Sequence, residues 1–439
     1  MTTRTRARTI FPIVLAALPL TACDTSTLLD VDDPDVVTPE DILGERGAEL
    51  LWAGALGQFA RAFSSGTDGQ VPFAGLAADE FHSSDTDPGL HAIDRRDLDD
   101  RSANLLLQYR LLHQARVGLR NAAERLEATL PGDSRVAEMW SLNGYTHLLF
   151  TEHYCSGVPL SHTPIDGDVV YSPRVATDDI LEIALERFQS ATTAAGADAD
   201  QVNLAAVGLA RVYLNQGAYA QAAAAVAAVP DGWEYLIRSK GGGSPDQINS
   251  IYYNNFERRG WSLSDGEGGI GLAFRTNGDS RVPWQDSGGP GIDQTTPLYH
   301  QLKYASRDDD VVLASGVEAR LIEAEADLNG AATTWLTILN DLRDTEGLGP
   351  LADPGTQDAR EDLLFEERAR WLFGTAHRLG DLRRLVRQYG RAQATVFPSG
   401  AYFRGGAYGS DVNFPIPIEE RQNPELAGVT GAICLDRNA

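Results

Sequence analysis

The spacing of apolar residues along the chain predicts a mostly helical protein. In Arg46 to Phe63 and in Ala103 to Leu130, apolar side chains recur every three or four residues, which places them on one face of a helix. After residue 230 this pattern gives way to glycine clusters and aromatic residues with little periodicity. We therefore predict an all-α fold that carries long irregular loop insertions. Its mainly helical parts are residues 46–230 and 317–390, and its loop-rich parts are residues 231–316 and 391–439.

One pair of predicted helices has the signature of a tetratricopeptide (TPR) repeat. Gly217 supplies the turn between the two helices, and Ala210 and Ala222 are small at positions where the helices cross closely. A weaker second copy covers residues 319–342, with its turn at Gly330. We predict a TPR-like scaffold, although an ordinary helical bundle would also place alanine at its crossings.

The N-terminal 22 residues are typical of a secretory signal. Three arginines precede the apolar run Ile10 to Leu20, and small residues follow it. The sequence Leu20-Thr21-Ala22-Cys23 matches the bacterial lipobox, in which the cysteine becomes the lipidated first residue of the mature protein. The alternative is an ordinary signal peptide next to an incidental cysteine. We expect residues 1–22 to be removed, Cys23 to carry lipid, and the acidic stretch 23–45 to act as a tether.

The excess of acidic over basic side chains excludes one class of binding partner. The chain has 439 residues, with 62 acidic and 37 basic side chains and a net charge of −25. Removal of residues 1–22 takes away three arginines and no acids, which changes the net charge from −25 to −28. A protein this acidic is not a general nucleic-acid binder. We expect lipid alone to hold it at a membrane.

Two cysteines remain in the mature chain, Cys155 and Cys434. In an exported protein they either form a disulfide or stay as two independent thiols, and the sequence leaves both readings open. Three cysteines, one of them lipidated, do not suggest a zinc site. The glycine clusters lack the Lys-Ser/Thr of a phosphate-binding loop, and no His-Glu-x-x-His occurs, so we expect no metal and no cofactor.

Several short motifs follow one another in an order that is specific for one family. Ala324-Glu325-Ala326 precedes a Leu-Asn-x-x-Arg motif at residues 339–343, and Glu366-Glu367-Arg368 precedes an Asp-Leu-Arg motif at residues 381–383. The other segments are residues 29–40, 145–160, 178–195, 203–229 and 415–424, the last with Pro-Ile-Pro and Asn-Pro. With these motifs, almost the whole mature chain resembles the SusD/RagB family of outer-membrane nutrient-binding lipoproteins. Cys155-Ser156 is a local departure from the pattern.

The resemblance implies a fold, a partner and a location. The fold is a scaffold of about eight TPR helices, with irregular segments that make the ligand face. The partner is a TonB-dependent outer-membrane transporter of the SusC type, to which the protein delivers a captured oligosaccharide or peptide. The location is the outer membrane, with the lipid-anchored protein facing the cell surface.

Candidate ligand residues come from the insert, because binding residues are not fixed in sequence within the family. Sugar rings present apolar C–H faces that stack on Trp or Tyr, while their hydroxyl groups need polar partners. We predict ligand contacts from Trp261, Trp284, Tyr252, Tyr253, Asn277 and Arg275. Trp261 and Trp284 are favoured because polar and glycine residues flank both. The alternative for each aromatic residue is that it pins the loop to the scaffold. Residues 64–92, including Asp79-Glu80-Phe81-His82, are a second candidate rim, in which we expect Asp79 and Glu80 to brace loops rather than to touch ligand.

Two other functions can be weighed from the sequence. A glycosidase needs two carboxylates that flank a cleft, but with 62 acids in the chain a pair of carboxylates is no evidence for catalysis. We therefore predict that the protein is not an enzyme. A TPR lipoprotein that serves only as an envelope assembly scaffold, without a small ligand, would leave the aromatic insert without a purpose. The acidic balance favours neutral cargo over polyanionic glycans.

Overall fold

The computed structural model of the chain describes residues 44–165 and 167–439. These residues form thirteen α-helices and four two-stranded sheets. The predicted signal and Cys23, and all but the end of the predicted tether, lie outside the described residues. None of the helices in the described ranges is long and apolar enough to cross a membrane.

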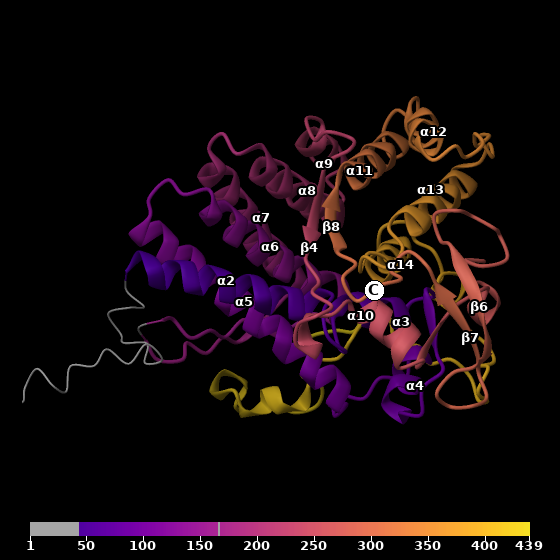
Figure 1. Cartoon of the computed structure of the whole chain (residues 1–439), viewed down its shortest axis with the longest axis horizontal. Helices are drawn as coiled ribbons and strands as arrows, with labels where there is room; N and C mark the ends of the chain where they lie inside the picture. Colours follow the sequence, from indigo (N-terminus) through magenta and orange to yellow (C-terminus); the bar gives the residue numbers. More distant parts are fainter. Residues whose placement is uncertain (1–43, 166) are drawn as a thin grey trace, which may run out of the picture.

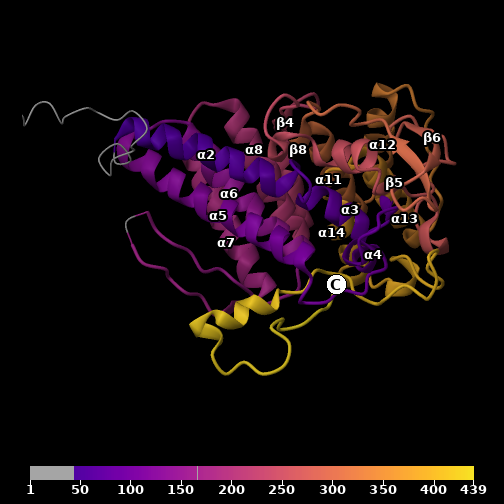
Figure 2. The same ribbon diagram turned by 60° about the horizontal axis from the view of Figure 1, so that its bottom comes forward.

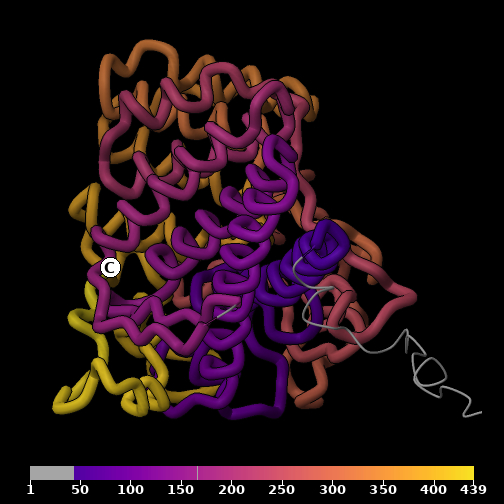
Figure 3. Tube along the Cα trace, turned by 90° about the vertical axis from the view of Figure 1, so that its left-hand side faces the viewer, coloured from indigo at the N-terminus to yellow at the C-terminus, as the bar shows by residue number. Residues whose placement is uncertain are grey.

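Ten helices form the scaffold, and the prediction of a mainly helical protein is confirmed. From α2 to α9 the scaffold helices pack on their neighbours in sequence, and α9 packs on α11 across the insert. Figure 1 shows them side by side, and Figure 3 shows their turns stacked in successive layers. Their bounds are α2 Glu45–Phe63, α5 Ala103–Thr129, α6 Arg135–His153, α7 Thr177–Ala195, α8 Ala199–Asn215, α9 Tyr219–Val226, α11 Gly316–Leu328, α12 Trp335–Thr345, α13 Gln357–Trp371 and α14 Arg378–Arg387. The shorter helices are α3 Gln70–Ala77, α4 Pro88–Asp94 and α10 Ser250–Tyr252.

Close packing of α6, α7 and α8 depends on two glycines. The fully buried ring of Phe188 on α7 fills the space above Gly144 on α6 and Gly208 on α8. A Cβ atom at Gly208 would lie 2.0 Å from that ring, and one at Gly144 would lie 2.8 Å from it. Any larger residue at either position would push the helices apart.

In the α8–α9 pair, glycine occupies the connecting turn and alanine occupies two buried positions. Gly217 lies in the connecting turn with φ +70°, a backbone conformation that suits glycine. Ala210 and Ala222 are completely buried between the helices.

The insert after residue 230 contains more strand pairing than its sequence suggests, although most of its residues lie outside helices and strands. Five of the eight strands lie within it. The strands are β1 Phe81–Ser83, β2 Val158–Pro159, β3 Arg174–Val175, β4 Glu234–Ile237, β5 Trp261–Leu263, β6 Trp284–Pro290, β7 Pro297–Gln301 and β8 Val311–Ser315. The pairs are β1–β5, β2–β3, β4–β8 and β6–β7, all antiparallel. Strands this short carry little alternation, and most partners are far apart in sequence, so local pattern does not reveal them.

The motifs at Glu325, Arg368 and Asp381 meet in one buried ionic network that joins α11, α13 and α14. Arg368 donates to both oxygens of Asp381, at 2.9 and 3.0 Å. Arg384 donates to Asp381 at 2.8 Å and binds the carboxylate of Glu325. Burial disfavours a charged Asp381, but Arg368 and Arg384 outweigh it and hold the pKa of this carboxyl well below its usual range. Tyr389 donates to Glu325 at 2.7 Å.

Cys155 and Cys434 form a disulfide that ties the end of α6 to the C-terminal segment. Phe414 strengthens this junction: its carbonyl accepts from the Cys155 amide at 3.0 Å, and its ring packs on Tyr154. Figure 2 shows the C-terminal segment, in yellow, lying below α5 and α7. The open question between a disulfide and two thiols is thus settled in favour of the disulfide.

Removal of this disulfide is expected to destabilise the protein strongly. The bridge closes a loop across 279 positions, so the chain-entropy model assigns it about 5–6 kcal/mol. Cys155→Ser with Cys434→Ser should lower the denaturation midpoint in urea, and reduction of the wild type should give the same midpoint as the double variant. An unchanged midpoint after verified reduction would contradict the expectation.

Candidate functional site

An exposed tryptophan on the β6–β7 hairpin forms the centre of the candidate ligand surface. Trp284 is 37% exposed, and its indole Nε1 donates to the carbonyl of Arg275 at 3.0 Å. Tyr299 stands edge-on to it, with ring centroids 5.8 Å apart. The Arg275 guanidinium lies 3.5 Å from the centre of the Tyr299 ring and 5.7 Å from that of Trp284. These contacts fix the two rings before any ligand arrives.

Asp265 holds the turn that carries Arg275. Its carboxylate accepts from the backbone amides of Arg275 and Thr276, at 2.9 and 3.0 Å, and lies 4.0 Å from the Arg275 guanidinium. Burial opposes the charged form of Asp265, but the two amides and Arg275 keep its pKa below the usual value. Asn277 follows on the same turn and is exposed.

A second exposed ring, Phe403, comes from the C-terminal loop-rich region. Phe403 is 49% exposed and packs edge-on against His82, with centroids 5.2 Å apart. Burial, together with the cations of Arg275 and Arg404, lowers the pKa of His82 to about 4, so His82 is neutral at physiological pH. His82 therefore lies within the electrostatic field of Arg275, which contacts Trp284, and of Arg404, which follows Phe403.

Strand pairing brings the Phe403 and Trp284 groups onto one surface. In the β1–β5 pair, His82 lies opposite Ser262. The Ser262 hydroxyl accepts from the Tyr299 amide at 2.9 Å and donates to the Pro297 carbonyl at 3.0 Å. This chain of contacts connects His82 to β7 and thus to Trp284. We define Trp284, Arg275, Tyr299, His82 and Phe403 as the aromatic face.

A buried pair of acids supports this face from below. Asp94 accepts from the Ser83 amide and from the Tyr402 hydroxyl, both at 2.7 Å. Glu267 accepts from the Tyr408 hydroxyl at 3.0 Å. Burial raises the pKa of Asp94 to about 6, and burial with the nearby Asp94 raises the pKa of Glu267 well above its usual value. The two carboxyls thus retain at least one proton near neutral pH and hold the loop that carries Phe403.

Asp94→Asn is expected to change how stability depends on pH. A carboxyl whose pKa is higher in the folded state stabilises the fold at low pH, and this contribution is lost as pH rises through the folded pKa, here about 6. The amide does not titrate and keeps an oxygen for Ser83 and Tyr402. Relative to the wild type, Asp94→Asn should therefore gain about 1–3 kcal/mol of unfolding free energy between pH 4 and pH 8. Denaturant titrations of both proteins at pH 4 and pH 8 measure this gain. If the variant and the wild type differ in unfolding free energy by the same amount at both pH values, the raised pKa of Asp94 is contradicted.

Trp261 does not lie where its sequence context suggests. Only 1% of its surface is exposed, and it packs against Phe73 and Phe81 with centroids 5.5 and 6.3 Å away. Its polar and glycine neighbours reflect the turn before β5 and the alternation of a paired strand, not a surface loop. The prediction that Trp261 contacts ligand is therefore dropped, and its role is to pin the insert to the core.

Tyr252 and Tyr253 are half-buried and lie apart from the Trp284 rings. Tyr252 stacks on Phe256 at 5.0 Å, and Phe256 stacks on His300 at 4.2 Å. Because His300 and Tyr299 are consecutive in β7, their side chains point to opposite faces of the hairpin. Of the six predicted residues, Trp284, Arg275 and Asn277 come together.

Sequence reasoning missed Tyr299 and Phe403. Tyr299 carries no local signal, because it is one aromatic among many in the insert. Phe403 stands between Tyr402 and Arg404-Gly405-Gly406, and an aromatic residue next to a flexible glycine pair is the signal that could have indicated it. Asp79 and Glu80 of the second rim brace the structure, as predicted: both are buried, and Asp79 pairs with Arg378 at 2.6 and 2.7 Å.

No group of three or more His, Cys, Asp or Glu side chains in the described part of the chain is arranged to hold a metal ion. The acidic run at residues 308–310 braces loops. Asp309 accepts from two backbone amides of its own turn, and Asp310 accepts from the Ser239 amide at 2.9 Å.

Comparison with known proteins connects the chain to one fold. No protein-family model matches the sequence, and no curated protein is similar to it. A solved SusD superfamily protein from Parabacteroides distasonis matches with a TM-score of 0.65 at 13% identity, covering 89% of this chain and 98% of that one. A laminarin-binding SusD-like protein matches with a TM-score of 0.60 at 17% identity, covering 87% and 98%. A SusD-like carbohydrate-binding protein from Bacteroides vulgatus matches with a TM-score of 0.58 at 14% identity, covering 77% and 83%. The chain therefore has the SusD-like fold over most of its length.

Proposed function

We propose that this SusD-like chain captures neutral oligosaccharides on its aromatic face and is a member of the SusD/RagB family. One observation carries the proposal: Trp284 is exposed while Arg275 and Tyr299 hold its ring in place. A pyranose ring stacks on such a fixed indole at little entropic cost. Laminarin binding and carbohydrate binding by proteins of the same fold support this choice of ligand.

The charges around the face favour neutral cargo. Arg275 lies 4.0 Å from Asp265, and Arg404 pairs with Asp293. Both arginines are therefore compensated and do not form a positive patch on an otherwise acidic chain. A polyanionic glycan would meet net repulsion.

Capture without catalysis agrees with the arrangement of acids near the face. The two carboxyls directly below it, Asp94 and Glu267, are buried and bonded to tyrosine hydroxyls, so they cannot flank a glycosidic bond at the surface. An exposed aromatic face is also what a purely structural assembly scaffold does not need. We therefore favour capture over both alternatives.

Affinity electrophoresis of the purified protein tests the proposal. Native gels that contain laminarin, xylan, glucomannan or glycogen should retard the protein in at least one case, and a gel with polygalacturonate should not. Mobility that is the same in all four neutral gels as in a polymer-free gel would contradict glycan capture. Retardation by polygalacturonate alone would contradict the neutral ligand class.

The proposal extends to delivery. We propose that the chain carries its cargo on a TPR-type scaffold to a TonB-dependent transporter of the SusC type in the outer membrane, and that lipid on Cys23 anchors it there, facing the cell surface. The lipobox sequence and the family resemblance support this part.

Cys23→Ser is expected to release the protein from membranes. Without a thiol at this position no lipid can be attached, so the variant should lose radiolabelled palmitate and move from the membrane fraction to the soluble fraction. Thr25→Ala, two residues further on, is the matched control and should stay with the membranes. A Cys23→Ser variant that remains membrane-bound would contradict the lipid anchor.

A further inference from the structure

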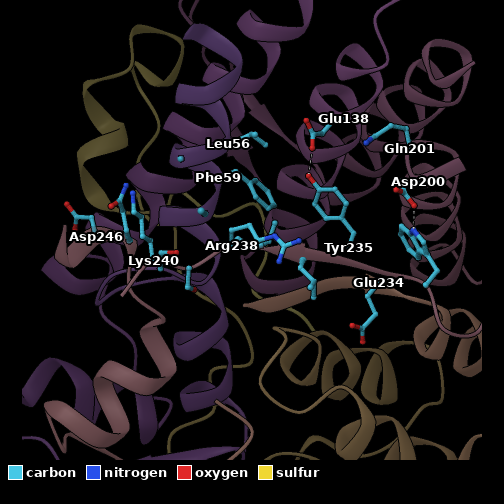
Figure 4. A pocket seen from close by; sticks show the side chains of 18 residues that line it. Leu56, Phe59, Glu138, Asp200, Gln201, Glu234, Tyr235, Arg238, Lys240 and Asp246 are labelled. Carbon is cyan, nitrogen blue, oxygen red and sulfur yellow. Dashed lines mark hydrogen bonds between the residues drawn. The ribbon is translucent and has the colours of Figure 1, made fainter. Parts of the chain in front are cut away.

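A cavity of about 640 Å³ lies between α2 and strand β4, away from the residues of the aromatic face. Its size is typical of small-molecule sites. Leu56 and Phe59 of α2 line one side, and residues 233–240 line the other (Figure 4). We call this cavity the β4 groove.

Two aromatic rings in the β4 groove are fixed by hydrogen bonds to the scaffold. Tyr235 donates to Glu138 of α6 at 2.7 Å, and Figure 4 shows the ring pointing toward this carboxylate. Trp233 donates to Asp200 of α8 at 3.0 Å. The second oxygen of Glu138 accepts from Trp52, also at 2.7 Å, so the anchor of Tyr235 is itself held in place. Both rings are half-buried and need no reorganisation to stack on a ligand.

Polar groups without partners surround these rings. The side-chain amide of Gln201 makes no hydrogen bond to any described residue, and its oxygen is among the buried atoms that lack a partner. Lys240 is exposed at the rim, and among residues 44–165 and 167–439 its side chain has no ion pair or hydrogen bond. Glu234 alternates with Trp233 and Tyr235 along β4, and Figure 4 shows its carboxylate on the opposite side of the strand from Tyr235. The amide of Gln201 and the ammonium of Lys240 can bond the hydroxyls of a sugar whose C–H face lies on the aromatic rings.

An extended peptide is the main alternative occupant, because β4 pairs with β8 alone among the strands of the described residues, and its other edge lines the groove. The carbonyl of Trp233 accepts from the backbone amide of Gly316. The backbone N–H and C=O groups of the next residue, Glu234, therefore point away from β8. The register then shifts between Tyr235 and Leu236, and such a bulge interrupts the regular donors and acceptors that strand addition requires. Recognition by side chains is therefore favoured over recognition by the strand edge.

The chain's own residues 23–43 are a poor occupant as well. They carry seven acidic residues and no basic ones. The groove lining carries more carboxylates than cations: Glu138, Asp200, Glu234 and Asp246 against Arg238 and Lys240. Like charges would repel the segment.

From these contacts we propose that the β4 groove is a second binding site for neutral oligosaccharide, built on Trp233 and Tyr235. This inference rests on the proposed function for its ligand class and adds a place on the chain that is independent of Trp284. Two sites on one chain would raise the avidity for a long polysaccharide without any new contact at either site.

Calorimetric titration of the full chain with laminarihexaose, maltohexaose, cellohexaose and xylohexaose tests the second site. The wild type should bind at least one of these sugars at two sites, and Trp284→Ala should keep one site. Adding Trp233→Ala to Trp284→Ala should weaken this remaining binding at least tenfold. Gln201→Leu, which breaks no hydrogen bond within the protein, should weaken it at least threefold in a chain that unfolds as the wild type does. Gln189→Leu on α7 is the matched control and should have no effect.

The outcomes separate the two sites. If Trp284→Ala removes all binding, or if Trp233→Ala and Gln201→Leu leave the remaining binding unchanged, the β4 groove is not a sugar site while the proposed function stands. If Trp233→Ala removes all binding and Trp284→Ala removes none, the groove is the site and the aromatic face is not. Absence of binding by the wild type to all four sugars would overturn both. Binding of an acetylated Thr-Val hexapeptide in place of the sugars, sensitive to Trp233→Ala, would identify a peptide site and overturn the inference.

Discussion

Arg384→Met is expected to lower the free energy of unfolding by about 3–5 kcal/mol. The substitution keeps an aliphatic chain of similar length but removes the cation that binds Glu325 and Asp381. Glu325 is completely buried and Asp381 is 4% exposed, so both would be left as poorly compensated charges in the interior. Denaturant unfolding followed by circular dichroism measures the effect.

Arg120→Met is the matched control for this prediction. Arg120 pairs with Glu124 one helical turn away, at 2.7 Å, on the exposed side of α5. Surface pairs of this kind contribute at most about 0.5 kcal/mol. If Arg384→Met lowers the free energy of unfolding by no more than Arg120→Met does, the buried ionic network does not hold α11, α13 and α14 together.

Trp284→Ala is expected to weaken oligosaccharide binding to the aromatic face at least tenfold, which corresponds to about 1.4 kcal/mol. The loss follows because Trp284 is 37% exposed and open to a ligand, whereas its neighbour Tyr299 is half-buried. Because this ring lies at the surface, the variant should unfold at nearly the same denaturant concentration as the wild type. Calorimetric titration with the sugar that gives the largest gel retardation measures the affinity.

Tyr171→Ala serves as the control for loss of an exposed aromatic residue. Tyr171 is 47% exposed on the loop between β2 and β3, outside the aromatic face. Its removal should leave the affinity unchanged. Equal losses in Trp284→Ala and Tyr171→Ala would show that the aromatic face has no specific role.

The helical scaffold could be predicted because its cause is local. Apolar residues at helical spacing define the buried face of each helix, and the predicted bounds for α2 and α5 differ from the observed ones by a single residue. The short motifs at Glu325, Arg368 and Asp381 were visible only as a pattern. Their physical basis, one shared ionic network, depends on packing between helices that are distant in sequence.

The ligand surface could be predicted only in part, because its cause is not local. Trp261 and Trp284 have similar neighbours in sequence, yet one is 1% exposed and the other 37%. The difference comes from pairing partners: Trp261 lies in β5 against β1, while Trp284 begins a hairpin at the edge of the fold. Phe403 joins the same face from a segment more than a hundred residues further along the chain. A local stretch of sequence cannot reveal that these distant residues share a face.

The most direct test of glycan capture at the aromatic face is a titration followed through the indole N–H signals of the seven tryptophans. Nitrogen-15 labelling gives each indole its own signal, and Trp284→Phe assigns the one that matters. Added oligosaccharide should shift the Trp284 signal in a saturable way and leave that of the buried Trp261 in place. A saturating sugar that leaves the Trp284 signal unmoved would contradict binding at this face.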